Sequence, residues 1–387
     1  MNRQKAVKVV VYGGMFDPPR EGHFSLIRAA LRDIGPDILY VVPGFGSPFK
    51  EPPGADFAAR AAMVRSGLRS HGLGGDVRIK VHPYEARRGR VTYTWRTIAF
   101  FRRLHPDASL YFLMGSDCLE TFRRWKNYRR ILSSARLLVG VRAGFSLRGP
   151  VSLPYKRLRG RFPAVSSTAL KAGLFSGSRV PGLPGDTAKY IAVRGLYLGG
   201  LRARLKRSMP PARFRHTLGV ARLALALAQR YGADPRRTAL AALLHDVARG
   251  LSKEAMLARA AVCRPGMPAM RAAARNAPVV LHAYAGAVIA EKKYGVKDPE
   301  VLRAIRVHAF GRASSGLLDK IIFTADLAEA GRNFPEARAI RKLAFKDLDA
   351  AYAAAQRVKL AHIIGLGGWV HPESVKAWNS PLEKNRS

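Results

Sequence analysis

Short apolar runs and amphipathic stretches alternate along the first half of the chain. Five apolar runs have the length of buried strands, at residues 7–12, 38–42, 77–81, 110–114 and 135–141. Stretches with apolar residues at helical spacing lie among them, near residues 23–33, 56–68, 93–104 and 119–132. This alternation is typical of a parallel sheet with helices on both faces. Ligands of such sheets bind at the carboxyl ends of the strands, which places residues 12–14 and 114–117 at the expected site.

The pattern changes near Gly199, and no strand is predicted beyond it. Six segments have helical periodicity, at residues 214–231, 236–249, 280–294, 299–307, 315–330 and 337–364. Pro235 and Pro299 suit first-turn positions, and Asp234 and Asp298 before them are candidate N-caps. The sequence therefore predicts an α/β doubly wound parallel-sheet (Rossmann-like) domain at residues 1–198 and an all-α domain at residues 199–387.

Length and composition fit two cytoplasmic domains. The 387 residues are long for one domain, and 48% of them are hydrophobic, so each half can bury a core. No apolar run reaches the roughly 18 residues that a membrane span requires, and the N-terminus shows no signal-peptide pattern. Cys118 and Cys263 lie far apart and match no metal or disulfide spacing. These features predict a protein of the reducing cytoplasm that has no membrane partner.

The net charge of +41 is the strongest compositional feature. Such a charge attracts polyanions, including nucleotides and nucleic acid. The charge is spread along the chain without a long basic tail, and arginines on solvated faces would explain it equally. Since no recognition motif with stacking aromatics accompanies the charge, we expect phosphorylated small molecules rather than nucleic acid as partners.

The stretch YGGMFDPPREGHF, residues 12–24, joins the first predicted strand to the first predicted helix. Gly13 and Gly14 allow positive φ and a close approach of a ligand to the backbone. A helix that begins near Gly22 offers free N–H groups and the positive end of its dipole, and His23 can donate to a phosphate oxygen. Ordinary turns also contain glycines, so these residues alone leave both a phosphate site and a plain turn open.

The same stretch resembles the GGxFDPxHxGH signature of the nucleotidylyltransferase superfamily, most closely the nicotinate-nucleotide adenylyltransferases. Five further pieces follow in the order of that family, over about the first 198 residues: VVPGFGSPFK, TYTWRTI, LYFLMGSDCLETFRRWKNY, VSSTALK and AKYIAVRGLYL. The resemblance implies adenylyl transfer from ATP to nicotinate mononucleotide, which gives nicotinate adenine dinucleotide and pyrophosphate, with Mg²⁺ on the ATP phosphates. Such in-line transfer relies on positioning and on stabilising charge at the phosphoryl oxygens.

The resemblance also implies site residues. The catalytic donors would be His23, Lys50 and Lys171. Asp117 would hold a sugar hydroxyl or order the site, and Trp125 would stack on the pyridine ring, although a tryptophan in an amphipathic segment is more often a core residue. The other implied nucleotide-binding residues are Gly13, Gly14, Phe16, Asp17, Arg20, Gly115, Ser166, Ser167 and Thr168.

Three positions depart from the family pattern. Arg20 stands where the first histidine of HxGH belongs, Arg96 replaces the acidic residue of SYTxDT, and Lys171 replaces the arginine of SSTxIR. Lysine keeps the charge but lacks the bidentate guanidinium, while Arg20 is longer than histidine and always charged. These changes leave two alternatives open, a working transferase and a site that only binds nucleotide.

Four histidines and two aspartates form an ordered set in the second half. Side chains from separate helices can converge in a bundle core, and neutral imidazoles with carboxylates suit divalent transition metals. One carboxylate can bridge two metals, and such a pair clamps a phosphate and activates water. Each histidine alone is more often a surface or core residue, but five segments in this order favour a metal centre. The set is His216, His245, Asp246, His282, His308 and Asp326.

These segments resemble the HD superfamily of metal-dependent phosphohydrolases, and more narrowly the symmetrical diadenosine tetraphosphate hydrolases. The matching text covers about residues 203–365: RFRHTLGVARLALALA, AALLHDVARGLS, LHAYAGAVIAEKKYGV and AIRVHAFGRASSGLLDKIIFTADLAEAGRNFPEARAIRKLA. The resemblance implies iron as the metal and two ADP as the products. It implies a catalytic, bridging Asp246 and two sets of ligands: His216, His245, Asp246 and Asp326 for one metal, and Asp246, His282 and His308 for the other.

Two features of this resemblance concern the substrate. The family's HTxG reads HAFG here, with Ala309 in place of threonine. The basic residues Arg249, Lys253, Arg312 and Arg332 are either phosphate contacts or solvated surface.

The leading interpretation is a bifunctional enzyme that acts on adenine nucleotides. Its expected partners are ATP, nicotinate mononucleotide and dinucleoside polyphosphates, with two divalent metals in the second half. Two alternatives stay open: a first half that only binds nucleotide beside a sole phosphohydrolase activity, and a nucleic-acid-binding HD phosphodiesterase. The sequence leaves the oligomeric state open.

Overall fold

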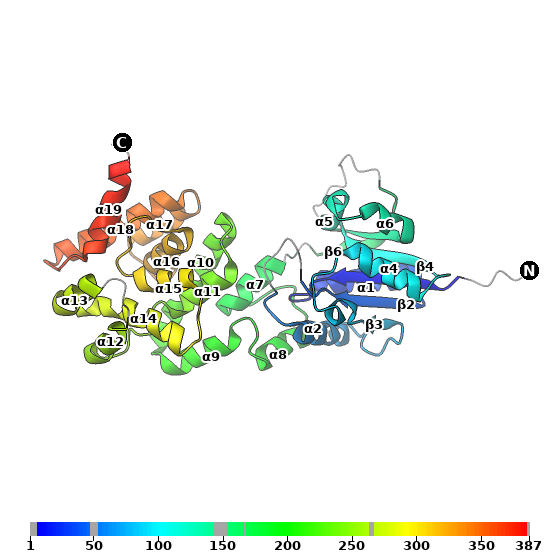
Figure 1. The fold of residues 1–387 in the computed structure, drawn as a ribbon, viewed down its shortest axis with the longest axis horizontal. Coiled ribbons are helices and arrows are strands. Elements are labelled where there is room, and N and C mark those ends of the chain that lie inside the picture. Colours follow the sequence, from blue (N-terminus) through cyan, green and yellow to red (C-terminus); the bar gives the residue numbers. More distant parts are fainter. Residues whose placement is uncertain are drawn as a thin grey trace, which may run out of the picture. The chain divides into compact units, whose positions relative to one another are not determined.

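The computed structural model describes residues 6–46, 53–142, 153–163, 165, 167–262 and 267–384. The chain folds into two compact units, one of Met1–Lys171 with Val180–Tyr197 and one of Ala172–Arg179 with Leu198–Ser387. Figure 1 shows the strands gathered in the first unit and helices throughout the second. The predicted order, an α/β domain followed by an all-helical one, is confirmed. Within the described ranges, no helix is both long and apolar enough to cross a membrane.

The first unit is built on a six-stranded parallel sheet of order β3-β2-β1-β4-β5-β6. The strands are β1 (Lys8–Gly14), β2 (Ile38–Pro43), β3 (Ile79–Val81), β4 (Ser109–Gly115), β5 (Arg136–Arg142) and β6 (Tyr155–Phe162). The sequence did not predict β6, because only Leu158 and Phe162 of this edge strand are buried and the rest lacks an apolar run.

Helices follow the strands of the first unit. They are α1 (Glu21–Ile34), α2 (Phe57–Ser70), α3 (Tyr84–Arg87), α4 (Thr94–Leu104), α5 (Ser116–Leu119), η1 (Phe122–Arg124), α6 (Tyr128–Ser134) and α8 (Gly185–Val193). Helix α7 (Ser167–Ser176) belongs to the first unit up to Lys171 and to the second from Ala172. The prediction of one helix at residues 119–132 is wrong. Extended backbone at Trp125 and a left-handed Asn127, with φ of 55°, separate η1 from α6 there.

Side chains of the strands alternate between two cores. Val9 and Val11 of β1 pack in one core with Ile98 of α4, whereas Val10 packs in the other with Ile27 of α1. The sheet is therefore covered on both faces, as the sequence predicted. Because β1 lies beside β4 and the strand order reverses between them, the carboxyl ends of these two strands form the switch point at which such sheets bind ligands.

The second unit contains only helices among its described residues. They are α9 (Gly199–Ser208), α10 (Pro211–Tyr231), α11 (Pro235–Leu244), α12 (Lys253–Ala260), α13 (Met267–Asn276), η2 (Pro278–Val280), α14 (Leu281–Lys292), α15 (Pro299–Val307), α16 (Leu317–Ala328), α17 (Pro335–Ala344), α18 (Leu348–Gly365) and α19 (Pro372–Lys384). The predicted caps are confirmed, since Asp234 accepts from the Arg237 amide and Asp298 from the Val301 amide.

Two predicted helices of this unit are wrong in extent. Residues 236–249 do not form one helix, because α11 ends at Leu244 and turns follow. Residues 337–364 form two helices, because α17 ends at Ala344 and Asp347 caps the start of α18 through the amides of Asp349 and Ala350.

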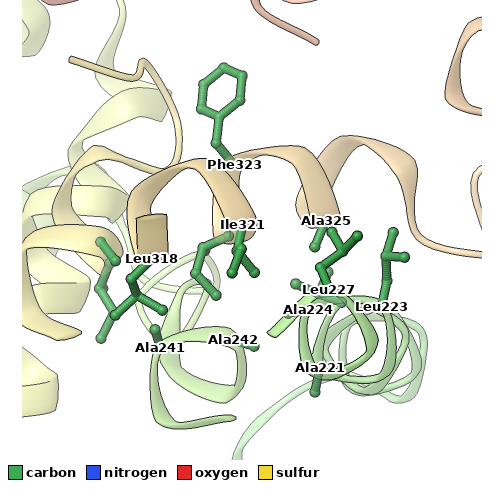
Figure 2. Close-up of a cluster of buried hydrophobic side chains, with 14 of the residues drawn as sticks. Ala221, Leu223, Ala224, Leu227, Ala241, Ala242, Leu318, Ile321, Phe323 and Ala325 are labelled. Atoms are coloured by element: carbon green, nitrogen blue, oxygen red, sulfur yellow. The ribbon is translucent and has the colours of Figure 1, made fainter. Parts of the chain in front are cut away.

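Helix α16 contributes many side chains to the hydrophobic core of the second unit. Figure 2 shows Leu318, Ile321 and Ala325 pointing towards α10 and α11, whereas Phe323 points away from them. All four side chains are buried. A helix packed on both sides has little freedom to rotate, so Asp326, the residue after Ala325, is held at a fixed position.

Candidate functional site

The corner between β1 and α1 is tied together by Asp17. This buried carboxylate accepts from the amides of Gly54 (2.8 Å) and Ala55 (3.2 Å) and from the hydroxyl of Tyr197 (2.7 Å). The ammonium of Lys171 lies 3.5 Å from the same carboxylate. Asp17 therefore joins four distant parts of the first unit, and it brings Lys171 to the switch point.

His23 is half-buried in the first turn of α1, next to Arg20. Its Nδ1 accepts the Arg20 amide at 3.0 Å, and the Nε of Arg20 lies 3.4 Å from its Nε2. Burial first, and then the nearby Arg20 and Arg142, lower the pKa of His23 well below its ordinary value. The imidazole is therefore neutral. Because Nδ1 accepts the Arg20 amide, the proton of the neutral imidazole is on Nε2. Nε2–H and the Arg20 Nε–H are therefore neighbouring donors, not partners of each other, and both can donate to a phosphate oxygen.

Arg20, Asp117 and Arg142 form a charged cluster at the ends of β4 and β5. Asp117 Oδ2 lies 3.0 Å from Nη1 of Arg142 and 4.0 Å from Nη2 of Arg20. Arg20 also donates to the carbonyl of Val165. A side chain at Gly115 would meet Asp117 Oδ1 at 2.7 Å, so it would displace this carboxylate. Two guanidinium groups thus flank the predicted phosphate site, and the sequence had not predicted Arg142.

The other predicted residues of the first unit are less closely grouped. Trp125 is half-buried against Phe122, with ring centroids 5.3 Å apart, which fits the core alternative. Ser167 is half-buried and Thr168 is exposed at the start of α7. Gly13, Gly14 and Phe16 lie at the end of β1 and just after it, and Arg96 is exposed. Lys50 and Ser166 fall outside the described residues.

In the second unit, the six predicted metal residues converge from five helical segments. His216 lies in α10, His245 and Asp246 directly after α11, His282 in α14, His308 after α15 and Asp326 in α16. Ligand atoms of His216, His245 and Asp246 lie within 4.8 Å of one another, as do those of Asp246, His282 and His308. Asp246 belongs to both groups.

Each imidazole of this centre is anchored through Nδ1. His245 Nδ1 donates to the Ala242 carbonyl at 2.7 Å, and His308 Nδ1 donates to the Ile305 carbonyl at 2.7 Å. His282 makes the same type of bond to the Val279 carbonyl. His216 Nδ1 lies 3.3 Å from the Glu329 carboxylate instead. All four Nε2 atoms are therefore directed to the middle of the group. A proton on Nδ1 leaves the Nε2 lone pair available, which is a usual arrangement for a histidine that binds a metal.

The two aspartates lie among these Nε2 atoms. Asp246 Oδ1 is 3.3 Å from His282 Nε2 and 3.7 Å from His308 Nε2, while Asp246 Oδ2 is 3.7 Å from His245 Nε2. Asp326 Oδ1 is 3.1 Å from His216 Nε2 and 3.7 Å from His245 Nε2. Asp246 therefore directs one oxygen to each group, which is the arrangement of a bridging carboxylate.

The chemistry of the donor set fits divalent cations. The Nε2 of His245 is fully buried and has no hydrogen-bond partner among the described residues. Burial first, and then the nearby His308, lower the pKa of His282 to about 3, so this imidazole is neutral at neutral pH. Burial alone would raise the pKa of Asp246, but the nearby His245 and His308 outweigh it and keep the carboxylate ionised. Neutral imidazoles and ionised carboxylates are the protonation states that metals bind.

Three cationic side chains flank this centre. Arg213 Nη1 lies 2.5 Å from Asp246 Oδ2, Arg249 Nη1 lies 3.2 Å from His282 Nε2, and Lys359 Nζ lies 3.2 Å from Asp326 Oδ2. Of these, only Arg249 had been predicted. Arg213 lies three residues before His216, so helical spacing could have indicated it. No local sequence pattern indicates that Lys359 lies beside Asp326, or that Glu329 lies beside His216. Lys253 and Arg332 are exposed, and Arg312 is half-buried.

Two family models match the chain. A cytidylyltransferase-like model matches residues 11–173, and an HD domain model matches residues 213–344. The chain is 29% identical over 351 residues to a probable nicotinate-nucleotide adenylyltransferase/Ap4A hydrolase of Mycoplasma pneumoniae, which covers 89% of this chain and 96% of that protein.

Two further relatives each match one half. A probable nicotinate-nucleotide adenylyltransferase of Neisseria gonorrhoeae is 33% identical over 202 residues, with 49% of this chain and 98% of that protein covered. A symmetrical bis(5'-nucleosyl)-tetraphosphatase of Bacillus subtilis is 34% identical over 175 residues, with 45% of this chain and 92% of that protein covered.

Proposed function

The chain belongs to the nicotinate-nucleotide adenylyltransferase family in its first half and to the HD-type symmetrical bis(5'-nucleosyl)-tetraphosphatase family in its second, and we propose that it is a cytoplasmic enzyme with both activities. The functional boundary lies between residues 198 and 199. The proposed hydrolase activity rests on the geometry of Asp246, which directs one carboxylate oxygen to each of two histidine groups. The proposed transferase activity rests on the neutral imidazole of His23, which lies near the Arg20 and Arg142 guanidinium groups.

In the proposed transfer, a phosphate oxygen of nicotinate mononucleotide forms a bond to the α-phosphorus of ATP. The bond from that phosphorus to the β-phosphate bridging oxygen breaks, and pyrophosphate leaves. The backbone at Gly14 lets the nucleotide approach, while His23 Nε2–H and the guanidinium of Arg20 stabilise charge on the phosphoryl oxygens. Lys171 adds a further cation, and Mg²⁺ on the ATP phosphates offsets more of the charge.

In the proposed hydrolysis, diadenosine tetraphosphate is split symmetrically. Water adds to one of the two central phosphorus atoms, the central phosphoanhydride bond breaks, and two ADP leave. His216, His245, Asp246 and Asp326 would hold one divalent ion, and Asp246, His282 and His308 the other, with iron as the proposed metal. When bound, such a pair polarises a phosphoryl oxygen and lowers the pKa of water. Asp246 would belong to both ligand sets, and Arg249, next to His282, would be available to bind a phosphate.

Paired assays on the full chain test this proposal. Wild type, His23→Ala and Asp246→Ala would each be assayed with ATP, Mg²⁺ and nicotinate mononucleotide, and separately with diadenosine tetraphosphate. Each substitution is expected to abolish one activity and leave the other unchanged. A wild-type protein that binds ATP but forms no dinucleotide would favour the alternative in which the first half binds nucleotide without catalysing adenylyl transfer. The replacement of the family's histidine by Arg20 suggests this alternative.

A further inference from the structure

Lys359 is a cation of α18 that lies next to the proposed metal ligands. Its Nζ is 3.2 Å from Asp326 Oδ2, 3.0 Å from the carbonyl oxygen of His308 and 4.1 Å from the centroid of the Phe323 ring. Only 19% of its side chain is exposed. The ammonium is therefore held between α15 and α16 by three separate contacts, which fixes its position before any ligand binds.

A lysine at this point does not favour metal binding. Asp326 already directs Oδ1 to His216 and His245, so its second oxygen is the one that faces Lys359. A positive charge this close to a pair of divalent ions repels them. Its presence is physically reasonable if the complete site also holds an anion, because a phosphate near Lys359 would be attracted by the same charge.

We infer that Lys359 binds a phosphate oxygen of the polyphosphate substrate; this inference rests on the proposed phosphohydrolase activity. An ammonium has three N–H donors, and the described residues provide hydrogen-bond acceptors for two of them, Asp326 and the His308 carbonyl. The third N–H has the weaker contact with the Phe323 ring, which a phosphate oxygen can replace. Two metal ions clamp one phosphate, so a substrate with four phosphates has further negative charge for Lys359 to neutralise.

Ala309 lies near Lys359. The two residues line the same cavity of about 10 Å³, which is too small for a phosphate, together with Phe310 and Phe323. Ala309 is the position at which the resemblance to the hydrolase family implies threonine. This chain thus has a charged donor, Lys359, near the position that lacks the hydroxyl.

The test compares four variants of the metal-loaded full chain. Lys359→Met and Lys359→Gln remove the charge, Lys359→Arg keeps it, and Arg357→Gln changes an exposed residue of the same helix as a control. Calorimetry would give the Kd for ADP, elemental analysis the metal content, and steady-state kinetics the KM for diadenosine tetraphosphate. Both neutral variants are expected to raise Kd and KM by about tenfold or more, with undiminished metal content, because a charged hydrogen bond is lost. Lys359→Arg should retain most of the affinity, and Arg357→Gln should match wild type.

Two results would overturn the inference. A loss of metal with unchanged ADP affinity of the loaded protein would show that Lys359 only positions Asp326. Unchanged Kd and unchanged metal content in both neutral variants would show that it does neither. A wild-type protein that hydrolyses no diadenosine tetraphosphate would refute the proposed function instead, while the ADP measurements would still decide whether Lys359 binds phosphate.

Discussion

His216 directs its Nδ1 at the carboxylate of Glu329, 3.3 Å away, while its Nε2 faces Asp326 and the proposed metal centre. The other three imidazoles of the centre are anchored by backbone carbonyls. Glu329 is buried, and a side chain at Gly219 would clash with its carboxylate. The glycine one turn after His216 in α10 thus leaves room for Glu329, whose carboxylate contacts Nδ1 of His216.

Replacement of Glu329 by glutamine is expected to weaken metal binding about 10- to 100-fold without unfolding the protein, because a charged partner of a ligand histidine is lost. Titration of the apoprotein with metal would measure this effect. Glu336→Gln, on the exposed start of α17, provides the control. Equal affinity in Glu329→Gln and wild type would mean that the His216 orientation does not depend on this carboxylate.

The bridging arrangement of Asp246 makes a prediction about metal stoichiometry. Asp246→Ala should lose both ions, because each group of ligands contains this residue, whereas His308→Ala should lose only one. Elemental analysis of both variants against wild type would show the difference. If Asp246→Ala kept one full equivalent of metal, the carboxylate would not bridge.

Arg20 is expected to contribute to ATP binding in the first unit. Arg20→Ala should raise the KM for ATP in dinucleotide synthesis by about tenfold or more, because a buried charged donor beside His23 is removed. Hydrolysis of diadenosine tetraphosphate should not change. Arg28→Ala, an exposed residue of the helix that Arg20 precedes, is the matched control, and an equal effect of both substitutions would contradict a specific role for Arg20.

The buried His371 is expected to make the free energy of unfolding depend on pH. It is buried, stacks on Phe310 and hydrogen-bonds to the hydroxyl of Tyr284, and burial lowers its pKa to about 4, with the nearby Glu373 opposing this. The unfolded chain takes up this proton near pH 6.5. Between these values the unfolded state binds more protons, so the free energy of unfolding should fall as the pH falls from 6.5 to 4.

Urea unfolding of the full chain at a series of pH values would test this dependence. His371→Phe should flatten the fall in stability relative to wild type, because phenylalanine keeps the stacking and cannot take up a proton. His362→Phe, on the exposed side of α18, should leave the profile unchanged. A wild-type slope that persists in His371→Phe would assign the pH dependence to other groups.

The sequence by itself determined the strand–helix alternation, the change to an all-helical second half, the caps at Asp234 and Asp298, and the identity of the residues that converge on the proposed metal centre. These features depend on local spacing or on chemically distinctive side chains. Only the tertiary structure placed the exposed edge strand β6, divided residues 337–364 into two helices, and brought Arg142 to the switch point. It also brought Glu329 to His216 across 113 positions and Lys359 to Asp326 across 33. Contacts of this kind depend on how helices pack, and an ordinary lysine or glutamate carries no local pattern that distinguishes it from a solvated one.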